Sequence, residues 1–297
     1  MDNQNKIKMR DTIDINSNDN ALFVTAQCNN RCVMCCQPPA KADDIDVLYV
    51  KNIKLIDSAP KSLPVIGITG GEPTLLGDRL FELISHIKEV LPDTEIHILS
   101  NGRAFADINF AKKLSRCGGE NILFGIPLHA DNAVDHDTIT RVKGSFDETL
   151  LGLYNLERMS ADIELRYVLS KMNYARLPQM SDFIYRNLPF VRYISLMGLE
   201  YTGYTIKNHD KVWVDPIQYQ DELRKAVKYL AGWNMDVSIF NLSHCVLPKD
   251  LWSYARKSIS DWKNNFELFC DECTMKAQCC GLFATSRKQS PSLHPIK

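Results

Sequence analysis

The sequence lacks an excess of charge of either sign, and it lacks long apolar runs. Its 35 basic and 36 acidic residues leave a formal net charge of −1, which provides no field to attract nucleic acid or an anionic membrane. No apolar run reaches the ~18 residues that a membrane-spanning helix needs. We therefore expect neither a nucleic-acid partner nor a membrane partner.

A secretory signal is also missing from the first twenty residues. They read MDNQNKIKMRDTIDINSNDN, are polar, and contain no apolar core of the kind that signal peptides carry. The sequence shows no internal repeat and no low-complexity segment. We expect a cytoplasmic protein, and in that compartment thiols stay reduced.

Cysteine, by contrast, is abundant and unevenly placed. Nine of the ten cysteines form two groups: Cys28, Cys32, Cys35 and Cys36 near the start, and Cys245, Cys270, Cys273, Cys279 and Cys280 near the end. Because clustered cysteines in a reducing compartment indicate metal or redox chemistry, each group is a candidate metal site. Cys117 stands apart, and we expect a small core thiol there.

Short apolar, β-branched runs alternate with amphipathic stretches along most of the chain. The candidate strands span residues 21–27, 65–71, 95–102, 122–130, 162–170 and 191–200. This alternation predicts an α/β fold with a parallel sheet, either a partial (β/α)6 TIM-like barrel or a doubly wound sheet, and we favour the barrel. In both architectures ligands bind at the carboxyl ends of the strands.

Apolar spacing and capping residues predict the helices. The stretch 78–91 places five aliphatic side chains on one face: Leu80, Leu83, Ile84, Ile87 and Leu91. The stretch 145–159 opens with Ser145 and Glu148 at the spacing of a capping box. A further helix after the sixth strand is marked by Tyr219, Leu223, Ala226, Val227 and Leu230.

The pattern of alternation changes near residue 232. We expect a polar N-terminal segment (1–20), a core barrel (21–231), a small cysteine-rich domain (232–285) and a loose tail (286–297). A single α/β barrel can take up most of a chain of this length, so the boundaries follow the pattern rather than the length.

The first cysteine group has the spacing Cys28-x3-Cys32-x2-Cys35. A structural zinc site would need Cys36 as its fourth ligand, but such sites usually use two separated pairs, and adjacent cysteines rarely both reach one zinc. A [4Fe–4S] cluster held by three thiolates leaves one iron open for a chelating ligand. Buried thiols without a metal are the remaining alternative.

Together with Gly70-Gly71-Glu72-Pro73 after the second strand, this cysteine pattern resembles the radical S-adenosylmethionine (SAM) superfamily. The resemblance implies that the three thiolates hold a [4Fe–4S] cluster whose open iron is chelated by SAM. It also implies reductive cleavage of SAM to a 5′-deoxyadenosyl radical, which abstracts hydrogen from the substrate. Residues Gly70, Gly71, Glu72 and Pro73 are then expected to contact SAM, since glycine lets the backbone approach a ligand closely.

Three further side chains are candidate SAM contacts. Ser100 and Asn101 belong either to an ordinary tight turn or to a contact with SAM, for instance with its ribose. Arg166 lies in the apolar fifth strand, where a buried charge needs a partner. That partner is either the SAM carboxylate or a protein carboxylate such as Glu164. The sequence assigns no residue a catalytic role.

Other polar residues near strand ends have less defined roles. His129 follows the fourth strand and is either a satisfied polar residue or a ligand contact. Glu200, at the end of the sixth strand, faces either a cavity or solvent. The pair His136-Asp137 precedes the helix at 145–159, and we expect it to cap a loop.

The second cysteine group offers four thiolates, from Cys245, Cys270, Cys273 and Cys279. Zinc ribbons also use Cys-x2-Cys pairs, so a structural zinc site is one interpretation. We favour an auxiliary [4Fe–4S] cluster with every iron ligated, in a domain resembling the twitch and SPASM types. Because Cys280 adjoins Cys279, either one is a candidate for the fourth ligand.

Longer stretches narrow the resemblance: CNNRCVMCCQPP, GSFDETLLGLYNL, YRNLPFVRYISLMGLEYTGY and SISDWKNNFELFC. They resemble the C component of His-Xaa-Ser peptide maturation systems. The resemblance implies a ribosomally made precursor peptide as substrate, a second radical SAM protein as partner, and a reductase as electron donor. The alternatives are a radical SAM enzyme that acts on a small molecule and a zinc-stabilised binding protein.

Overall fold

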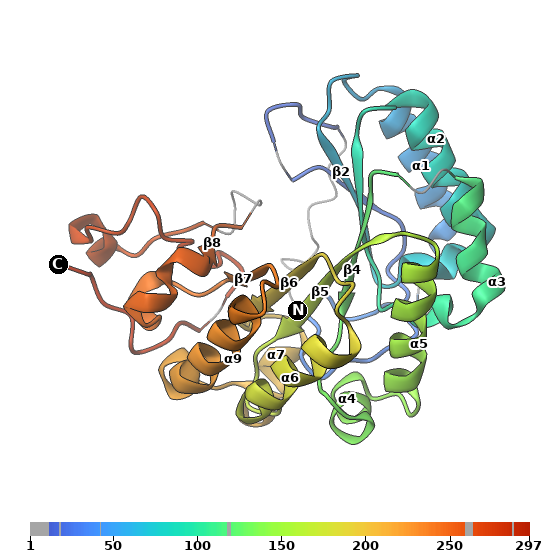
Figure 1. The fold of residues 1–297 in the computed structure, drawn as a ribbon. Helices are drawn as coiled ribbons and strands as arrows, with labels where there is room; N and C mark the ends of the chain where they lie inside the picture. Colours follow the sequence, from blue (N-terminus) through green and yellow to red (C-terminus); the bar gives the residue numbers. More distant parts are fainter. Residues whose placement is uncertain (1–11, 18, 42, 118–119, 259–263, 287) are drawn as a thin grey trace. The chain divides into compact units, whose positions relative to one another are not determined.

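The computed structural model describes residues 12–17, 19–41, 43–117, 120–258, 264–286 and 288–297 (Figure 1). Most of the predicted polar segment 1–20 therefore lies outside the described residues. The quoted stretch SISDWKNNFELFC is described except for residues 259–263. None of the described helices is long and apolar enough to cross a membrane.

The described chain alternates between strands and helices, as Figure 1 shows. The strands are β1 (Ala21–Phe23), β2 (Val65–Thr69), β3 (Glu95–Leu99), β4 (Ile122–Pro127), β5 (Asp162–Val168), β6 (Tyr193–Met197), β7 (Val237–Phe240) and β8 (Ala255–Arg256). The α-helices are α1 (Ile45–Asp57), α2 (Asp78–Val90), α3 (Ile108–Ala111), α4 (Ala133–Thr140), α5 (Ser145–Arg158), α6 (Leu177–Asn187), α7 (Tyr204–Lys207), α8 (His209–Val212) and α9 (Gln220–Gly232).

The strands follow one another in the sheet in the same order as in the chain, from β1 to β8. Their registered pairings are parallel, which confirms the predicted α/β fold. The order is open, with β1 and β8 at its ends, as in a partial barrel. Strands β7 and β8 come from the predicted cysteine-rich domain, so the sheet extends beyond the six predicted strands.

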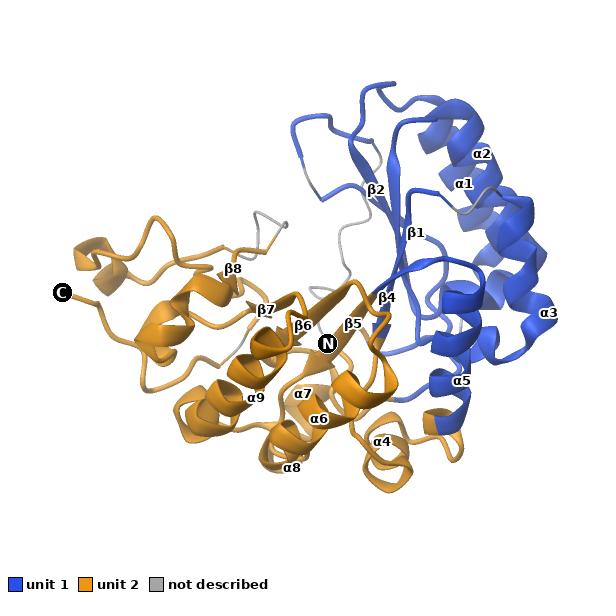
Figure 2. Ribbon diagram, in the orientation of Figure 1, with its two compact units in different colours: residues 1–31, 38–126, 147–163 blue, residues 32–37, 127–146, 164–297 orange. Residues whose placement is uncertain are grey.

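The chain divides into two compact units (Figure 2). Unit 1 comprises residues 1–31, 38–126 and 147–163, and unit 2 comprises residues 32–37, 127–146 and 164–297. Each unit is built from three separate stretches of the chain, and the stretches of the two units follow one another in turn. The predicted boundary between residues 231 and 232, which follows a change in sequence pattern, stays a prediction.

In unit 1, one face of the sheet is fully buried. Ile66 lies opposite Ile96, and Ile68 lies opposite Ile98 in the parallel register, and all four side chains have no exposed surface. Helix α2 buries Leu80, Leu83, Ile84 and Ile87, as the apolar spacing predicts. Burial of this many aliphatic side chains is the main source of stability for the unit.

In unit 2, the two faces of the sheet differ in character. Leu165 and Tyr167 of β5 have no exposed surface, whereas the alternate residues Glu164 and Arg166 lie on the other face. The Tyr167 hydroxyl donates to the Asn173 carbonyl over 3.0 Å, which satisfies its polar end. The second face of β5 is therefore the polar one.

The start of helix α5 differs from the prediction. The capping box expected from Ser145 and Glu148 does not form, because the Ser145 hydroxyl donates to Asp137 over 2.9 Å and Glu148 accepts from Arg103 over 2.6 Å. Asp137 caps the helix instead, since its carboxylate accepts from the N–H groups of Phe146 at 2.9 Å and Gly144 at 2.5 Å. The His136-Asp137 pair was expected to cap a loop, and the structure places Asp137 at the start of helix α5 instead.

The last residues, predicted as a loose tail, make specific contacts within unit 2. The Ser290 hydroxyl donates to the carboxylate of the buried Asp215 over 2.8 Å. The carbonyl of Ile296 accepts from the N–H of Thr274 over 2.9 Å. Sequence reasoning missed these contacts because serine and proline near a terminus are usually read as disorder.

Candidate active site

Gly70 and Gly71, directly after β2, lie against the backbone that leads to the first cysteine. The Gly71 N–H donates to the Thr25 carbonyl over 2.7 Å, and a Cβ atom at Gly71 would lie 1.9 Å from the Gln27 carbonyl oxygen. The structure therefore requires glycine at this position for a backbone–backbone contact. The predicted approach of the same glycines to SAM stays a prediction.

Glu72 is a buried hub of hydrogen bonds, with 1% of its surface exposed. Its Oε1 accepts from the N–H of Thr74 at 3.0 Å, the Thr74 hydroxyl at 2.7 Å and the Ser100 hydroxyl at 2.7 Å. Its Oε2 accepts from the N–H of Asn101 at 2.7 Å. Pro73 is the first residue of the short 3-10 turn Pro73–Leu76 that Glu72 caps. Glu72 thus fastens the end of β2 to the end of β3.

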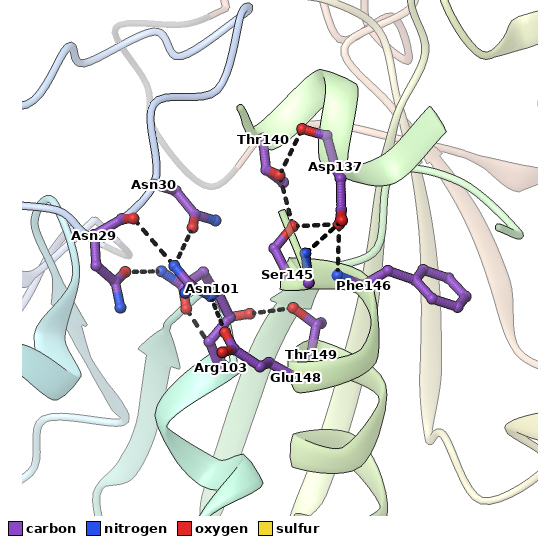
Figure 3. A network of polar contacts seen from close by, with 12 residues as sticks. Asn29, Asn30, Asn101, Arg103, Asp137, Thr140, Ser145, Phe146, Glu148 and Thr149 are labelled. Carbon is purple, nitrogen blue, oxygen red and sulfur yellow. Dashed lines mark hydrogen bonds and ion pairs between the residues drawn. The ribbon is translucent and has the colours of Figure 1, made fainter. Parts of the chain in front are cut away.

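Asn101 connects the end of β3 to the first cysteine. Its side-chain amide donates to the Asn29 Oδ1 over 2.6 Å, and it also forms a hydrogen bond with the Cys28 side chain. Figure 3 shows this part of unit 1, in which Arg103 donates to the Asn29 carbonyl at 3.0 Å and to the Asn30 Oδ1 at 2.7 Å. Asn101 was predicted to belong either to a turn or to a SAM contact. Its support of the cysteine loop is a third role that was not predicted.

Cys28 is held in a partly buried environment. Burial raises the pKa of its thiol above the ordinary value, and the negative charge of Glu72 adds to the rise. The N–H of Asn30, 3.3 Å from the sulfur, and the Asn101 side chain act in the opposite direction. Binding to a metal removes the thiol proton, and the same donors would then stabilise the thiolate.

In unit 2, the segment that contains Cys32, Cys35 and Cys36 is fixed by residues after β6. The Tyr204 N–H donates to the Cys35 carbonyl over 2.9 Å, and the Asn208 side chain donates to the Val33 carbonyl over 2.7 Å. A Cβ atom at Gly203 would lie 2.4 Å from the Cys35 carbonyl oxygen. These contacts with the cysteine segment were not predicted from the sequence. The feature of the sequence that could have indicated them is Gly203 in the stretch YTGY.

Arg166 lies on the polar face of β5 with an unsatisfied donor. Its Nε forms the expected ion pair with Glu164, at 3.8 Å from Oε1. This distance is beyond hydrogen-bond range, and the buried Nε has no hydrogen-bond partner among the described residues. Glu164 instead accepts from the Ser195 hydroxyl over 2.5 Å. A buried guanidinium N–H without a partner is rare, and a ligand carboxylate is the acceptor that fits it.

His129 also carries an unsatisfied atom. Its Nδ1 is buried and has no partner among the described residues. Burial lowers the pKa of the imidazole to about 3, and the neighbouring His136 acts in the same direction. His129 is therefore neutral at ordinary pH, and one of its ring nitrogens is left to accept from, or donate to, a ligand.

Two other candidates have structural contacts. Glu200 accepts a hydrogen bond from the Thr285 hydroxyl, and the neighbouring Tyr201 N–H donates to Ser286 over 2.9 Å. These bonds fasten the end of β6 to the last part of the chain. Cys117 is buried, with 7% of its surface exposed, which confirms its expected role as a core thiol.

The second cysteine group lines one cavity in unit 2. Cys245, Cys270, Cys273 and Cys279 all contribute to its wall, although they come from segments up to 34 residues apart in the sequence. The remaining wall is largely apolar and includes Phe266, Phe269, Leu282, Leu293 and Ile296. Four sulfurs around one apolar cavity fit the donor set of an iron–sulfur cluster or of zinc.

The structure distinguishes Cys279 from Cys280. Cys279 lines the cavity, and hydrogen bonds from the Cys280 thiol and the His244 side chain lower its pKa to about 3, against the effect of burial. Donation to Cys279 and burial raise the pKa of Cys280 well above its ordinary value. Because Cys279 lines the cavity and Cys280 does not, Cys279 is favoured as the ligand, and the Cys280 thiol donates to the Gly281 carbonyl over 3.4 Å.

Among the described residues, no three cysteine, histidine, aspartate or glutamate side chains are arranged so that they could hold a metal ion. The ligand assignments for Cys28, Cys32 and Cys35, and for the four cysteines of the second group, therefore stay predictions.

Comparison with protein families and curated proteins gives clear matches. The Radical SAM superfamily profile matches residues 22–184. Fe-coproporphyrin III synthase of Methanosarcina barkeri is 32% identical over 166 residues, which cover 54% of this chain and 39% of that protein. Pre-heme d1 synthase of Dinoroseobacter shibae is 25% identical over 159 residues, covering 53% of this chain and 38% of that protein. The match spans about two fifths of the length of these relatives.

Solved structures with a similar fold include two proteins with SAM bound. Streptococcus suis SuiB bound to S-adenosylmethionine has a TM-score of 0.58 at 16% identity, covering 74% of this chain and 49% of that one. Native anSMEcpe with bound AdoMet and the Kp18Cys peptide has a TM-score of 0.55 at 16% identity, covering 73% of this chain and 62% of that one. At these identities the likeness shows the fold alone.

Proposed function

Because this chain belongs to the radical SAM superfamily, we propose that it is an enzyme that modifies a ribosomally made precursor peptide. Its substrate class is a peptide with His-Xaa-Ser repeats. A second radical SAM protein and a reductase act as its partners.

The residues that would hold the catalytic cluster are Cys28, Cys32 and Cys35. When bound, this [4Fe–4S] cluster with SAM supplies a 5′-deoxyadenosyl radical for hydrogen abstraction. The chain's own groups fix the thiolates: Asn101 supports Cys28, and the Tyr204 N–H supports Cys35. The three-thiolate donor set and the family match support this assignment.

Arg166 is the residue that would bind the carboxylate of SAM. Its buried Nε lacks an acceptor among the described residues, and the SAM carboxylate supplies one. Ser100 and Asn101 would lie near the ribose, and Gly70 to Pro73 near the amino group. Water is excluded from such a site because the radical must meet only its substrate.

An auxiliary [4Fe–4S] cluster on Cys245, Cys270, Cys273 and Cys279 completes the proposed cofactor set. The cavity that these four residues line supports it. The Gly281 N–H, 3.4 Å from the Cys279 sulfur, provides the kind of N–H···S contact that tunes cluster potentials.

The observation that carries the peptide assignment is the contact of Gly203 and Tyr204 with Cys35. These residues belong to the stretch GLEYTGY, which resembles the His-Xaa-Ser maturases, and they build the candidate site rather than a remote surface. The similar fold of anSMEcpe holds a peptide in its structure, so a fold of this kind can accommodate a peptide substrate.

A radical SAM enzyme for a small molecule is the second candidate. It is favoured by the sequence relatives, which are named as Fe-coproporphyrin III synthase, pre-heme d1 synthase and GTP 3′,8-cyclase. The matches cover only slightly more than half of this chain. They therefore support the shared radical SAM chemistry more than they support a shared substrate.

The experiment that tests the proposal is anaerobic reconstitution with iron and sulfide, followed by reduction with dithionite in the presence of SAM. We expect 5′-deoxyadenosine from the wild type and none from Cys32→Ala. A His-Xaa-Ser precursor peptide should increase the yield and change in mass, whereas coproporphyrin and GTP should do neither. Turnover of a tetrapyrrole or nucleotide in place of the peptide would establish the second candidate.

A further inference from the structure

The chain ends in a segment that reaches the cavity of the second cysteine group. We call residues 288–296 the C-terminal strap. Leu293, His294 and Ile296 contribute to the wall of the cavity, beside the four cysteines. The strap is therefore part of the site rather than a loose end.

Two backbone donors of the strap reach two different cysteines. The N–H of Ile296 donates to the Cys273 sulfur over 3.4 Å, and the N–H of His294 forms a hydrogen bond with Cys245. Pro295, between the two donors, has no N–H of its own. The strap thus donates hydrogen bonds to two of the four sulfurs.

Fixed contacts along its length hold the strap in place. The hydroxyls of Ser290 and Ser292 donate to the Asp215 Oδ2 over 2.8 and 3.4 Å, and Asp215 is buried with 7% of its surface exposed. The Lys288 ammonium lies 4.3 Å from the centre of the Trp213 ring, within the range of a cation–π contact.

The far end of the strap has a further attachment. The carbonyl of Ile296 accepts from both the N–H and the hydroxyl of Thr274, at 2.9 and 3.0 Å. Thr274 directly follows Cys273 in the chain. The strap is consequently clamped at both ends, and its donors are held against the cysteines between them.

We infer that the C-terminal strap positions Cys245 and Cys273 and shields their sulfurs from solvent. This role rests on the proposed auxiliary cluster, because N–H donation to a cluster thiolate stabilises the more negative, reduced state and raises the reduction potential. His294 and Ile296 act through the cysteines and are positioning residues.

The shielding is tested on metal-free protein with iodoacetamide. A variant that lacks residues 288–297 is compared with the wild type, and alkylation of each cysteine is followed by peptide mass spectrometry. We expect Cys245 and Cys273 to react about tenfold faster in the shortened variant, since thiol reactivity follows access and local charge. Cys117, which lies far from the strap in sequence and is buried in its own core, serves as the internal control. If Cys245 and Cys273 were alkylated at the same rates in the shortened variant as in the wild type, the shielding role would be overturned.

The hydrogen bonds are tested on the reconstituted protein by a redox titration followed by electron paramagnetic resonance. Ile296→Pro removes the donor to Cys273, and we expect a more negative midpoint potential of the auxiliary cluster. His294→Ala keeps its backbone N–H and should leave the potential unchanged. The same potential in Ile296→Pro and wild type would overturn the positioning role.

The two tests separate this inference from the proposed function. If the wild type holds zinc at the second cysteine group, the auxiliary cluster is wrong, and no auxiliary resonance appears in the titration. The alkylation rates in metal-free protein still decide whether the strap covers the cysteines.

Discussion

The Ser100 hydroxyl donates a hydrogen bond of 2.7 Å to the buried carboxylate of Glu72. Glu72 follows strand β2 and Ser100 follows strand β3, so this bond joins the ends of two adjacent parallel strands. Because the same carboxylate also accepts from the Asn101 N–H, and Asn101 supports Cys28, the position of the first cysteine depends on Glu72.

Replacing Glu72 with glutamine should destabilise the protein. The amide of Glu72→Gln places a donor where the carboxylate accepts, so at least one buried N–H or hydroxyl loses its partner, at a cost of about 2 kcal/mol in the free energy of unfolding. Urea denaturation of the metal-free protein measures the loss. Glu82→Gln, on the exposed face of α2, is the control and should change stability by less than ~0.5 kcal/mol.

Alanine at Gly71 should disturb the cysteine loop directly. Its Cβ atom would lie 1.9 Å from the Gln27 carbonyl oxygen, and relief of this clash moves the backbone that carries Cys28. We expect Gly71→Ala to lose most of the iron of the first cluster after reconstitution. Gly232→Ala is the matched control, because no atom lies within 4 Å of the added methyl group. Full iron content in Gly71→Ala would show that the loop tolerates the shift.

Arg166→Met should weaken SAM binding without loss of the cluster. The change removes the proposed charged donor for the SAM carboxylate, and we expect about a tenfold to hundredfold increase in Kd. Equilibrium dialysis with labelled SAM on the reconstituted protein measures the effect. Arg186→Met, which removes the exposed ion pair with Asp182, should leave Kd unchanged. If Arg166→Met bound SAM with the same Kd as the wild type, Arg166 would not be the residue that binds the SAM carboxylate.

Asp137 should make the stability of helix α5 dependent on pH. Burial opposes ionisation of its carboxyl, but hydrogen bonds from the N–H groups of Phe146 and Gly144 outweigh this effect and lower its pKa. A lowered pKa in the folded state adds stability above the unfolded value of ~3.9, and this stability is lost as the pH falls through the folded pKa.

The comparison of wild type with Asp137→Asn tests this cap. At pH 7 the wild type should be more stable by about 1 kcal/mol, as for other helix caps. The difference should shrink steadily below pH 4 in denaturation experiments at a series of pH values. A difference that does not vary with pH would mean that the charge of Asp137 contributes nothing to the cap.

Cys279 and Cys280 should respond differently to replacement. Cys279→Ala removes a sulfur from the cavity wall, and we expect about four fewer iron atoms per chain after reconstitution. Cys280→Ala removes only a donor to Cys279 and should retain the iron. Metal analysis for iron and zinc on anaerobically purified protein gives the result. If the wild type contained zinc in place of iron, and Cys279→Ala lost this zinc, the cavity would be assigned to a structural zinc site.

The sequence predicted the strands well and their ends less well. Alternating apolar runs placed β1 to β6 correctly because burial of aliphatic side chains such as Ile66 and Ile96 determines the pattern. The strands end earlier than predicted, since residues such as Thr25 and Asn101 leave the ladder to form the loops of the candidate site. The local pattern of apolar residues does not reveal where the backbone stops pairing with the neighbouring strand and begins to make loop contacts.

Side-chain roles were predictable in type but not in partner. Arg166 was expected to need a partner, and the expected alternative of an ion pair with Glu164 is present at 3.8 Å, although the Nε has no hydrogen-bond partner among the described residues. The expected contact of Glu72 with SAM stays a prediction, whereas the hydrogen bonds that its oxygens accept from four protein donors were not predicted. These partners lie up to 29 residues away, and no spacing rule in a single sequence connects such positions.

The bond from the Asn208 side chain to the Val33 carbonyl joins residues 175 positions apart in the chain. During synthesis the first cysteines leave the ribosome long before the residues that brace them, and at bacterial or eukaryotic elongation rates the delay is roughly 10 to 35 s. If these cysteines hold the proposed cluster, iron delivered within that interval would meet a loop that lacks its Asn208 contact. We therefore expect the cluster to be inserted after translation has passed α8.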